Sequence, residues 1–222
     1  MGIISVENLD RLFWLGRYSE RVYTSARLFA SSFDQMIDMD LENYAVFCSQ
    51  LDIPNIYLSK KGFCKRYITD ETDPNSIYSN LLRAYDNAVV LRNEIGSEPI
   101  AYIQLAVYDM KKSRMSEAPI VDLQKVIDHI LAFWGIVDDM IECENVRNII
   151  KTGKRIERLD LYGRLQMDRT SILREVHRLT GRIARTNLHY DKGQLEEIQT
   201  LAQAEPIDYD RIVILADQLR KD

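Results

Sequence analysis

Residues 7–28 read ENLDRLFWLGRYSERVYTSARL, and residues 144–165 read ENVRNIIKTGKRIERLDLYGRL. The two segments align without a gap and share Glu, Asn, Gly, a basic residue, Glu-Arg, a small residue, Arg and Leu in the same order. Agreement at so many fixed positions indicates an internal repeat. Neither segment contains proline, and apolar residues recur in both at helical spacing, so each copy predicts a long amphipathic helix.

The repeated motif places charged side chains on or beside the apolar face of each predicted helix. At about 100° per residue, Glu20 and Arg27 project within roughly 20° of each other, and both fall on the apolar stripe. The second copy places Glu157 and Arg164 in the same way. The arginine directly after each Glu lies about 100° away, on the flank of the stripe. The candidate residues of the motif are therefore Glu20, Arg21, Arg27, Glu157, Arg158 and Arg164.

These charges need partners from another helix. A carboxylate that leaves water for a core costs several kcal/mol unless it is paired and hydrogen-bonded. Glu20 and Arg27 cannot easily serve each other, because they lie roughly 10 Å apart along the helix axis. We expect the two motif helices to lie antiparallel about a pseudo-twofold axis, so that Glu20 meets Arg164 and Glu157 meets Arg27.

Two interpretations of the motif stay open at the level of sequence. One is a buried ionic network that fixes the register of the helices and does no chemistry. The other is a charged pocket that recognises an anionic or zwitterionic ligand, for which arginine forks and a Glu are suited. A Glu could also act as a general acid or base, but paired Glu and Arg residues do not specify a reaction.

The rest of the chain predicts an all-α fold. The 222 residues include only nine Gly and five Pro, which favours long helices over many strands joined by tight turns. We expect one domain over residues 1–222, a bundle of about seven helices with two pseudo-symmetric Glu-Arg motif helices. The first predicted helices cover 6–39, a short segment at 41–51 within an irregular crossing from 40 to 73, and 74–95, which Asp73-Pro74 opens. The next runs from Ser97 to a polar linker at 111–118, and another is opened by Pro119. The last predicted helices cover 145–167, 171–189 and two short C-terminal pieces, the second of which opens near Asp208.

Charge and cysteine content bound the classes of function. A net charge of −5 argues against a protein whose main task is to coat nucleic acid or an anionic bilayer. One basic stripe, formed by Arg174, Arg178, Arg182 and Arg185, would suit an acidic protein surface or nucleic acid, or is an exposed face paired to acidic residues. The three cysteines are widely spaced and form no CxxC pair, which suits a reducing compartment.

No metal site or cofactor is expected. The three histidines show no helical pairing with His or Cys, and no phosphate-binding loop occurs. No apolar run is long enough to span a bilayer, and Ser5 reads as a helix cap rather than as part of a leader. The sequence therefore predicts a soluble cytoplasmic protein.

At three anchors the sequence resembles the Alpha-E family, bacterial all-helical proteins named for their Glu-Arg motif. The anchors are the first motif copy, the segment from Asp73-Pro74-Asn75-Ser76 to Leu91-Arg92, and the second motif copy. In the middle anchor, the positions that fit the family pattern are Arg83, Asn87 and Arg92, whereas Tyr85 departs from it. The first two share a helix face and either extend a polar site or brace the bundle.

The resemblance also implies partners. Members of this family are typically encoded beside, or fused to, circularly permuted ATP-grasp proteins and transglutaminase-like cysteine peptidases, which implies a part in making or trimming amide-linked peptides. The first functional hypothesis is an accessory subunit that binds a peptide-like or anionic substrate, or the ligase itself, through the Glu-Arg helices. The alternatives are an enzyme acting on an amide or aminoacyl substrate with Glu20 or Glu157 as acid or base, and a nucleic-acid-binding module. Whether the chain is an enzyme stays open at this point.

Overall fold

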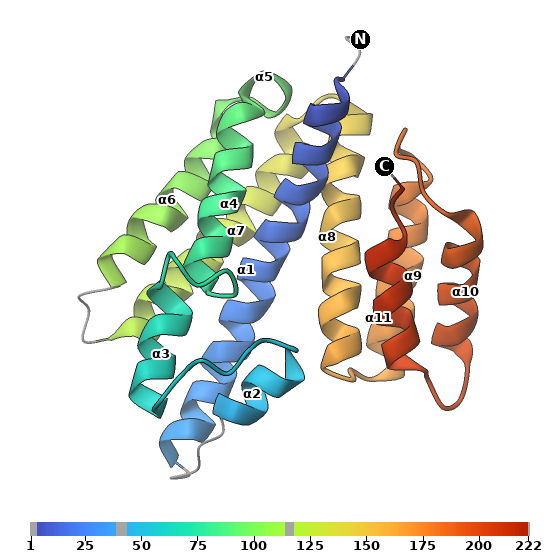
Figure 1. The fold of residues 1–222 in the computed structure, drawn as a ribbon. Helices are drawn as coiled ribbons and strands as arrows, with labels where there is room; N and C mark the ends of the chain where they lie inside the picture. The colour runs from blue at the N-terminus through green and yellow to red at the C-terminus, as the bar shows by residue number, and fades with distance from the viewer. Residues whose placement is uncertain (1–3, 39–43, 114–117, 222) are drawn as a thin grey trace. The chain divides into compact units, whose positions relative to one another are not determined.

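The computed structural model describes residues 4–38, 44–113 and 118–221, and every regular element in these ranges is an α-helix (Figure 1). This confirms the predicted fold class. The described helices are α1 (Val6–Asp38), α2 (Tyr44–Gln50), α3 (Lys60–Thr69), α4 (Ile77–Val90), α5 (Arg92–Ile95), α6 (Ser97–Ser113), α7 (Pro119–Met140), α8 (Glu144–Arg164), α9 (Arg169–Ile183), α10 (Lys192–Gln203) and α11 (Tyr209–Gln218).

The predicted number of about seven helices is too low, because local capping divides the chain more finely. Within the predicted irregular crossing, Ser59 caps α3 by accepting a hydrogen bond from the Gly62 amide at 3.1 Å. The predicted helix over 74–95 begins later, at the Ser76 cap, and is interrupted at Leu91, where ψ is 14°. Its predicted end at Gly96 is confirmed, since Gly96 adopts a φ of 78° that favours glycine.

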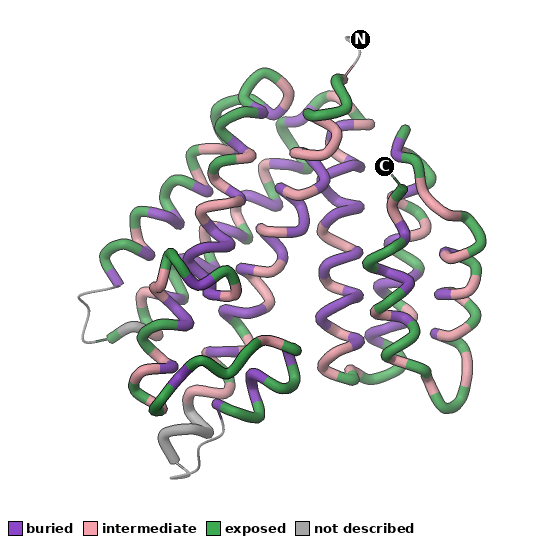
Figure 2. Tube along the Cα trace, viewed as in Figure 1, coloured by how far each residue is buried: buried purple, intermediate pink, exposed green. Residues whose placement is uncertain are grey.

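The chain divides into two compact units, Met1–Arg17 with Glu142–Asp222 and Tyr18–Ile141. α1 is one unbroken helix that contributes its first part to the first unit and the remainder to the second. In the first unit, α8 packs against α9 and α11, and α10 packs against the same two helices. α8 is buried along most of its length (Figure 2), and its fully buried apolar side chains include Ile149, Ile150 and Leu159.

The second unit combines a helical pair with an aromatic core. α6 packs along α7, α4 packs on α6, and α3 packs on α4. Phe29 of α1 lies 5.8 Å from the Phe63 ring of α3, and the Phe47 ring of α2 lies 5.1 Å from Tyr67. These tilted and edge-on contacts tie α1, α2 and α3 together. Among the described residues, no helix has the length and apolar character that a membrane span requires.

Candidate functional site

The two motif copies come together at their glycines, both within the first unit. A side-chain carbon on Gly16 of α1 would overlap the backbone carbonyl oxygen of Ile150 on α8. Reciprocally, a side-chain carbon on Gly153 would overlap the carbonyl oxygen of Phe13. Each glycine is thus opposite the residue that precedes the other glycine by three positions. The repeat produces a reciprocal contact in which two helix backbones approach closely because neither has a side chain in the way.

The two helices run in the same direction at this contact. Arg220 donates to Asp10 at 2.7 Å, and further along α1 Arg17 donates to Asp217 at 3.0 Å, so α1 and α11 are antiparallel. α8 is also antiparallel to α11, because Tyr209 at the start of α11 donates to the carbonyl group of the residue at position 167, just beyond the end of α8, at 2.9 Å. The first part of α1 and α8 are therefore parallel, and the predicted antiparallel arrangement is wrong.

The ion pair of Glu157 differs accordingly from the predicted one. Its carboxylate is fully buried and accepts from Arg17 Nε at 2.7 Å, rather than from Arg27. The same guanidinium also reaches Asp217 and lies over the Trp14 ring at 5.0 Å. Burial alone would lower the pKa of Arg17, but the two carboxylates raise it, so the guanidinium stays charged. The partner of Glu157 is thus Arg17, at a position that the two motif copies share only as a basic residue.

A second buried acid of α8, Asp160, lies close enough to this pair for the charges of Glu157 and Arg17 to act on it. Asp160 is buried, and Arg164 donates to its two carboxylate oxygens at 3.1 and 3.2 Å from one turn further on. Burial raises the pKa of Asp160, against the lowering effect of the hydrogen bond from Arg164. Arg158 points instead toward α9, where it lies 4.0 Å from Glu175. α8 therefore carries its motif charges into two separate groups of polar contacts.

The motif residues of α1 beyond Arg17 belong to the second unit. Glu20 is fully buried and accepts from Thr24 at 2.8 Å. Arg27 is exposed, and it donates to the hydroxyl of Tyr23 and covers its ring, so its predicted place on the apolar stripe is wrong. The buried stripe of α1 continues through Ala26 instead, and consecutive residues of a helix project about 100° apart.

Arg21, beside Glu20, lies near a group of buried hydroxyls. Burial is the main cause that raises the pKa of Tyr67, while a hydrogen bond from Ser25 and the charge of Arg21 lower it. Burial and the nearby Asp73 carboxylate raise the pKa of the Cys48 thiol to about 11. The thiol therefore stays protonated at neutral pH, which makes it a weak nucleophile.

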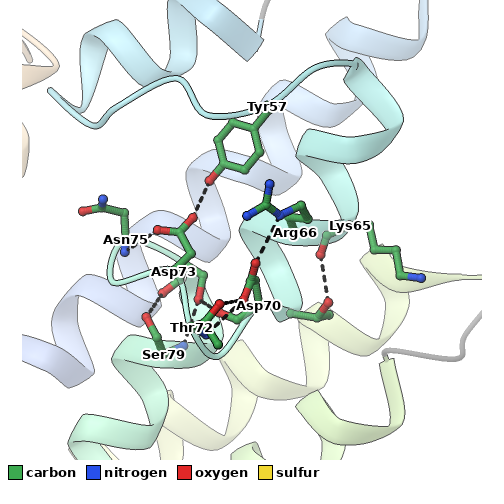
Figure 3. A network of polar contacts seen from close by, with 10 residues as sticks. Tyr57, Lys65, Arg66, Asp70, Thr72, Asp73, Asn75 and Ser79 are labelled. Atoms are coloured by element: carbon green, nitrogen blue, oxygen red, sulfur yellow. Dashed lines mark hydrogen bonds and ion pairs between the residues drawn. The ribbon is translucent and has the colours of Figure 1, made fainter.

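The middle anchor forms a compact polar network at the start of α4 (Figure 3). Asp73 is buried and accepts from the Tyr57 hydroxyl at 2.8 Å and from the Asn75 amide at 2.9 Å. Ser76 caps α4 by accepting from the Ser79 amide at 3.0 Å. The predicted cap at Asp73 is therefore wrong, because its carboxylate is already engaged by a side chain from the preceding loop.

The candidate residues of α4 and α5 extend this network only in part. Arg83 donates to the Pro74 carbonyl at 3.0 Å and lies over the Tyr18 ring at 5.7 Å, so it braces the turn before α4. Asn87 is half-buried on the same face one turn later. Arg92 is exposed on α5.

Glu175 of α9 is a buried carboxylate that the sequence analysis did not single out. It accepts from Arg155 of α8 at 2.7 Å and from Arg178 at 2.9 Å, and Arg174 lies 3.9 Å away. The predicted basic stripe thus forms one side of an arginine cluster around a single acid. An acidic residue between arginines on a predicted basic helix was the available signal, but its Arg155 partner comes from another helix.

Lys151 lies on α8 near this cluster. Burial, followed by the charges of Arg182 and Arg155, lowers its pKa to about 8. Within the described ranges, no group of three or more His, Cys, Asp or Glu residues could hold a metal ion.

Comparison with known proteins gives one match. A family model described as Alpha-E, a predicted alpha-helical domain with a conserved ER motif, matches residues 7–201. No curated protein and no solved structure matches the chain.

Proposed function

The chain belongs to the Alpha-E family, and from that premise we propose that it is a non-catalytic accessory subunit of an amide-forming system in the cytoplasm. It works with an ATP-grasp ligase, and a transglutaminase-like peptidase acts in the same system. The chain binds the ligase or its peptide-like substrate. The partners come from the resemblance of the three anchors to that family. The reducing compartment is supported by three free cysteines.

The observation that carries the non-catalytic role is the state of Glu157. Its carboxylate is fully buried and held by Arg17 at 2.7 Å in a contact of two helix backbones. A general acid or base must come within hydrogen-bonding distance of a substrate proton. A carboxylate committed to a buried guanidinium is instead suited to fixing the register of two helices. This supports a scaffold role for the motif over the alternative of Glu157 as acid or base.

Co-purification with the neighbouring ATP-grasp protein tests this function. We expect the two proteins to form a complex, and we expect ADP release and formation of an amide product, followed by mass spectrometry, to need both. The chain alone should turn over no amide or aminoacyl substrate. Turnover by the chain alone, abolished in a folded Glu157→Gln variant, would instead establish the catalytic alternative.

A further inference from the structure

The arginine cluster around Glu175 is built by two helices of the first unit. The carboxylate is 1% exposed, and its two oxygens accept from Arg155 of α8 and from Arg178 of α9. Arg174, one turn before Arg178 on α9, lies 3.9 Å from the same carboxylate and also donates to the Ser171 hydroxyl at 3.4 Å. The acid therefore holds guanidiniums from two helices in one place.

Positive charge exceeds negative charge in this cluster. Within the described part of the chain, Glu175 is the carboxylate that lies within 4.0 Å of Arg155, Arg174 and Arg178, and the charge of Arg174 also helps to lower the pKa of Asp168 at the start of α9. Arg158 of α8 lies 4.0 Å from the same carboxylate, so one negative charge faces four guanidiniums. Arg174 and Arg178 have side chains that are 51% and 45% exposed, so both can be reached from solvent. The Nε of Arg155 is buried and has no acceptor.

The excess of positive charge continues along the same two helices. Arg182, one turn beyond Arg178, donates to Asn148 of α8 at 2.9 Å. Burial and then the charges of Arg185 and Arg147 lower the pKa of Arg182, against the raising effect of the Glu144 carboxylate. Burial and then the charges of Arg182 and Arg155 lower the pKa of Lys151 in the same way. Such mutual repulsion is relieved when an anion binds.

We propose that this α8–α9 face, defined by Arg155, Arg174, Arg178 and Arg182, binds an acidic peptide segment through its carboxylates. Successive arginines on α9 are four residues apart and therefore about 6 Å apart along the helix. Side chains on one face of an extended peptide repeat at roughly 6.5 Å, so alternate acidic residues match this spacing. Guanidinium forks bind carboxylates through paired hydrogen bonds.

An acidic peptide fits this face better than nucleic acid does. No Phe, Tyr or Trp is interleaved with the arginines from Arg174 to Arg185, whereas single-stranded nucleic acid is usually bound by stacking on aromatic side chains. The net charge of −5 for the whole chain also opposes a long polyanion. A short acidic segment needs only the local charge of the α8–α9 face.

Equilibrium binding to the purified chain tests this proposal. The probe is fluorescein-labelled hexaglutamate, followed by fluorescence anisotropy, with hexaglutamine as the neutral reference. We expect saturable binding of hexaglutamate that weakens with added salt. The double variant Arg174→Gln with Arg178→Gln should weaken it by roughly tenfold or more. The matched control is Arg169→Gln with Arg211→Gln, which removes the same charge from exposed arginines paired elsewhere in the first unit and should change affinity less than about twofold.

Glu175→Gln separates a binding face from a purely structural cluster. Removal of the central negative charge should raise the affinity for hexaglutamate by about two- to fivefold, even if the variant unfolds at a lower urea concentration. Absence of hexaglutamate binding, or an equal loss in the two double variants, would overturn the proposal. Tighter binding of a hexauridylate than of hexaglutamate would also overturn it and assign the face to nucleic acid.

This inference rests on the proposed function for the identity of the bound segment, as substrate or as part of a partner. The two fail separately, because the anisotropy measurement uses no ligase. Hexaglutamate binding by a chain that forms no complex with the ATP-grasp protein would contradict the accessory role alone. Complex formation without hexaglutamate binding would contradict the α8–α9 face alone.

Discussion

Gly16 and Gly153 show at the scale of single residues why the repeat retains glycine within helices. Glycine costs about 1 kcal/mol relative to alanine in a helix interior. Here each glycine faces a backbone carbonyl oxygen of the other helix, and backbone atoms cannot turn aside as a flexible side chain can. The close approach also brings Arg17 of one helix to Glu157 of the other. The glycines therefore set the geometry of the buried ion pair.

Gly16→Ala and Gly153→Ala should each destabilise the chain despite the better helix propensity of alanine. The added carbon forces the helices apart, and we expect a loss of about 1–3 kcal/mol in the free energy of unfolding. Urea denaturation followed by circular dichroism measures it. Gly181→Ala is the control, since nothing lies within 4 Å of a carbon added there, and it should stabilise by up to about 1 kcal/mol. Equal effects at all three glycines would contradict the close approach.

Helical spacing correctly predicts which motif residues are buried as long as the buried stripe keeps the same angular position around the helix axis. Glu20 and Glu157 are both buried, in agreement with that spacing. Arg27 is exposed, because a long side chain can lie along the helix surface over the Tyr23 ring instead of entering the core. The Glu157 partner could not be predicted, since it depends on the relative direction of two helices distant in sequence.

At the scale of elements, the polar network between α3 and α4 includes one buried hydrogen bond from the loop that precedes α3. The Tyr57 hydroxyl donates to Asp73, whose other oxygen accepts from the Asn75 amide (Figure 3). Burial and then the Asp73 carboxylate raise the pKa of Tyr57, so the hydroxyl remains a donor at all ordinary pH values. The network fixes the turn that leads to the Ser76 cap.

Tyr57→Phe should lower the free energy of unfolding by about 1–3 kcal/mol, because it leaves a buried Asp73 oxygen without its donor. Tyr108→Phe on α6 is the matched control, since Tyr108 is exposed and the change should stay within roughly 0.5 kcal/mol. Both are measured by urea denaturation. A Tyr57→Phe variant as stable as the control would show that the hydroxyl contributes nothing to this connection.

The positions of helices were more predictable than their boundaries. α1 and α7 begin at the predicted Val6 and Pro119, because long proline-free apolar periods and a first-turn proline are local signals. The predicted C-terminal end of α1, at position 39, lies outside the described residues. α3 was missed because its polar surroundings outweigh a short apolar pattern. α8 ends before its predicted limit, at Arg164, since Gln166 adopts a φ of 47°, which the sequence does not indicate.

At the scale of the whole molecule, α1 is shared by the two compact units. Propagation of a helix is cooperative, so loss of helical structure in one part of α1 weakens the part beside it. We propose on this ground that residues 1–222 unfold as one cooperative domain. The chain contains two tryptophans, Trp14 in the first unit and Trp134 in the second, which can report on each unit separately.

The variant Trp134→Phe keeps Trp14 as the reporter of the first unit, and the variant Trp14→Phe keeps Trp134 as the reporter of the second. Trp14 lies 5.0 Å from the Arg17 guanidinium and 6.0 Å from the Phe13 ring, and Trp134 lies 4.9 Å from Phe133, so the fluorescence of each should change on unfolding. We expect coincident urea transitions. Gly16→Ala should lower both midpoints together, because damage in the first unit is then felt throughout the chain. A shift confined to the Trp14 signal would show instead that the units unfold independently and that α1 does not couple them.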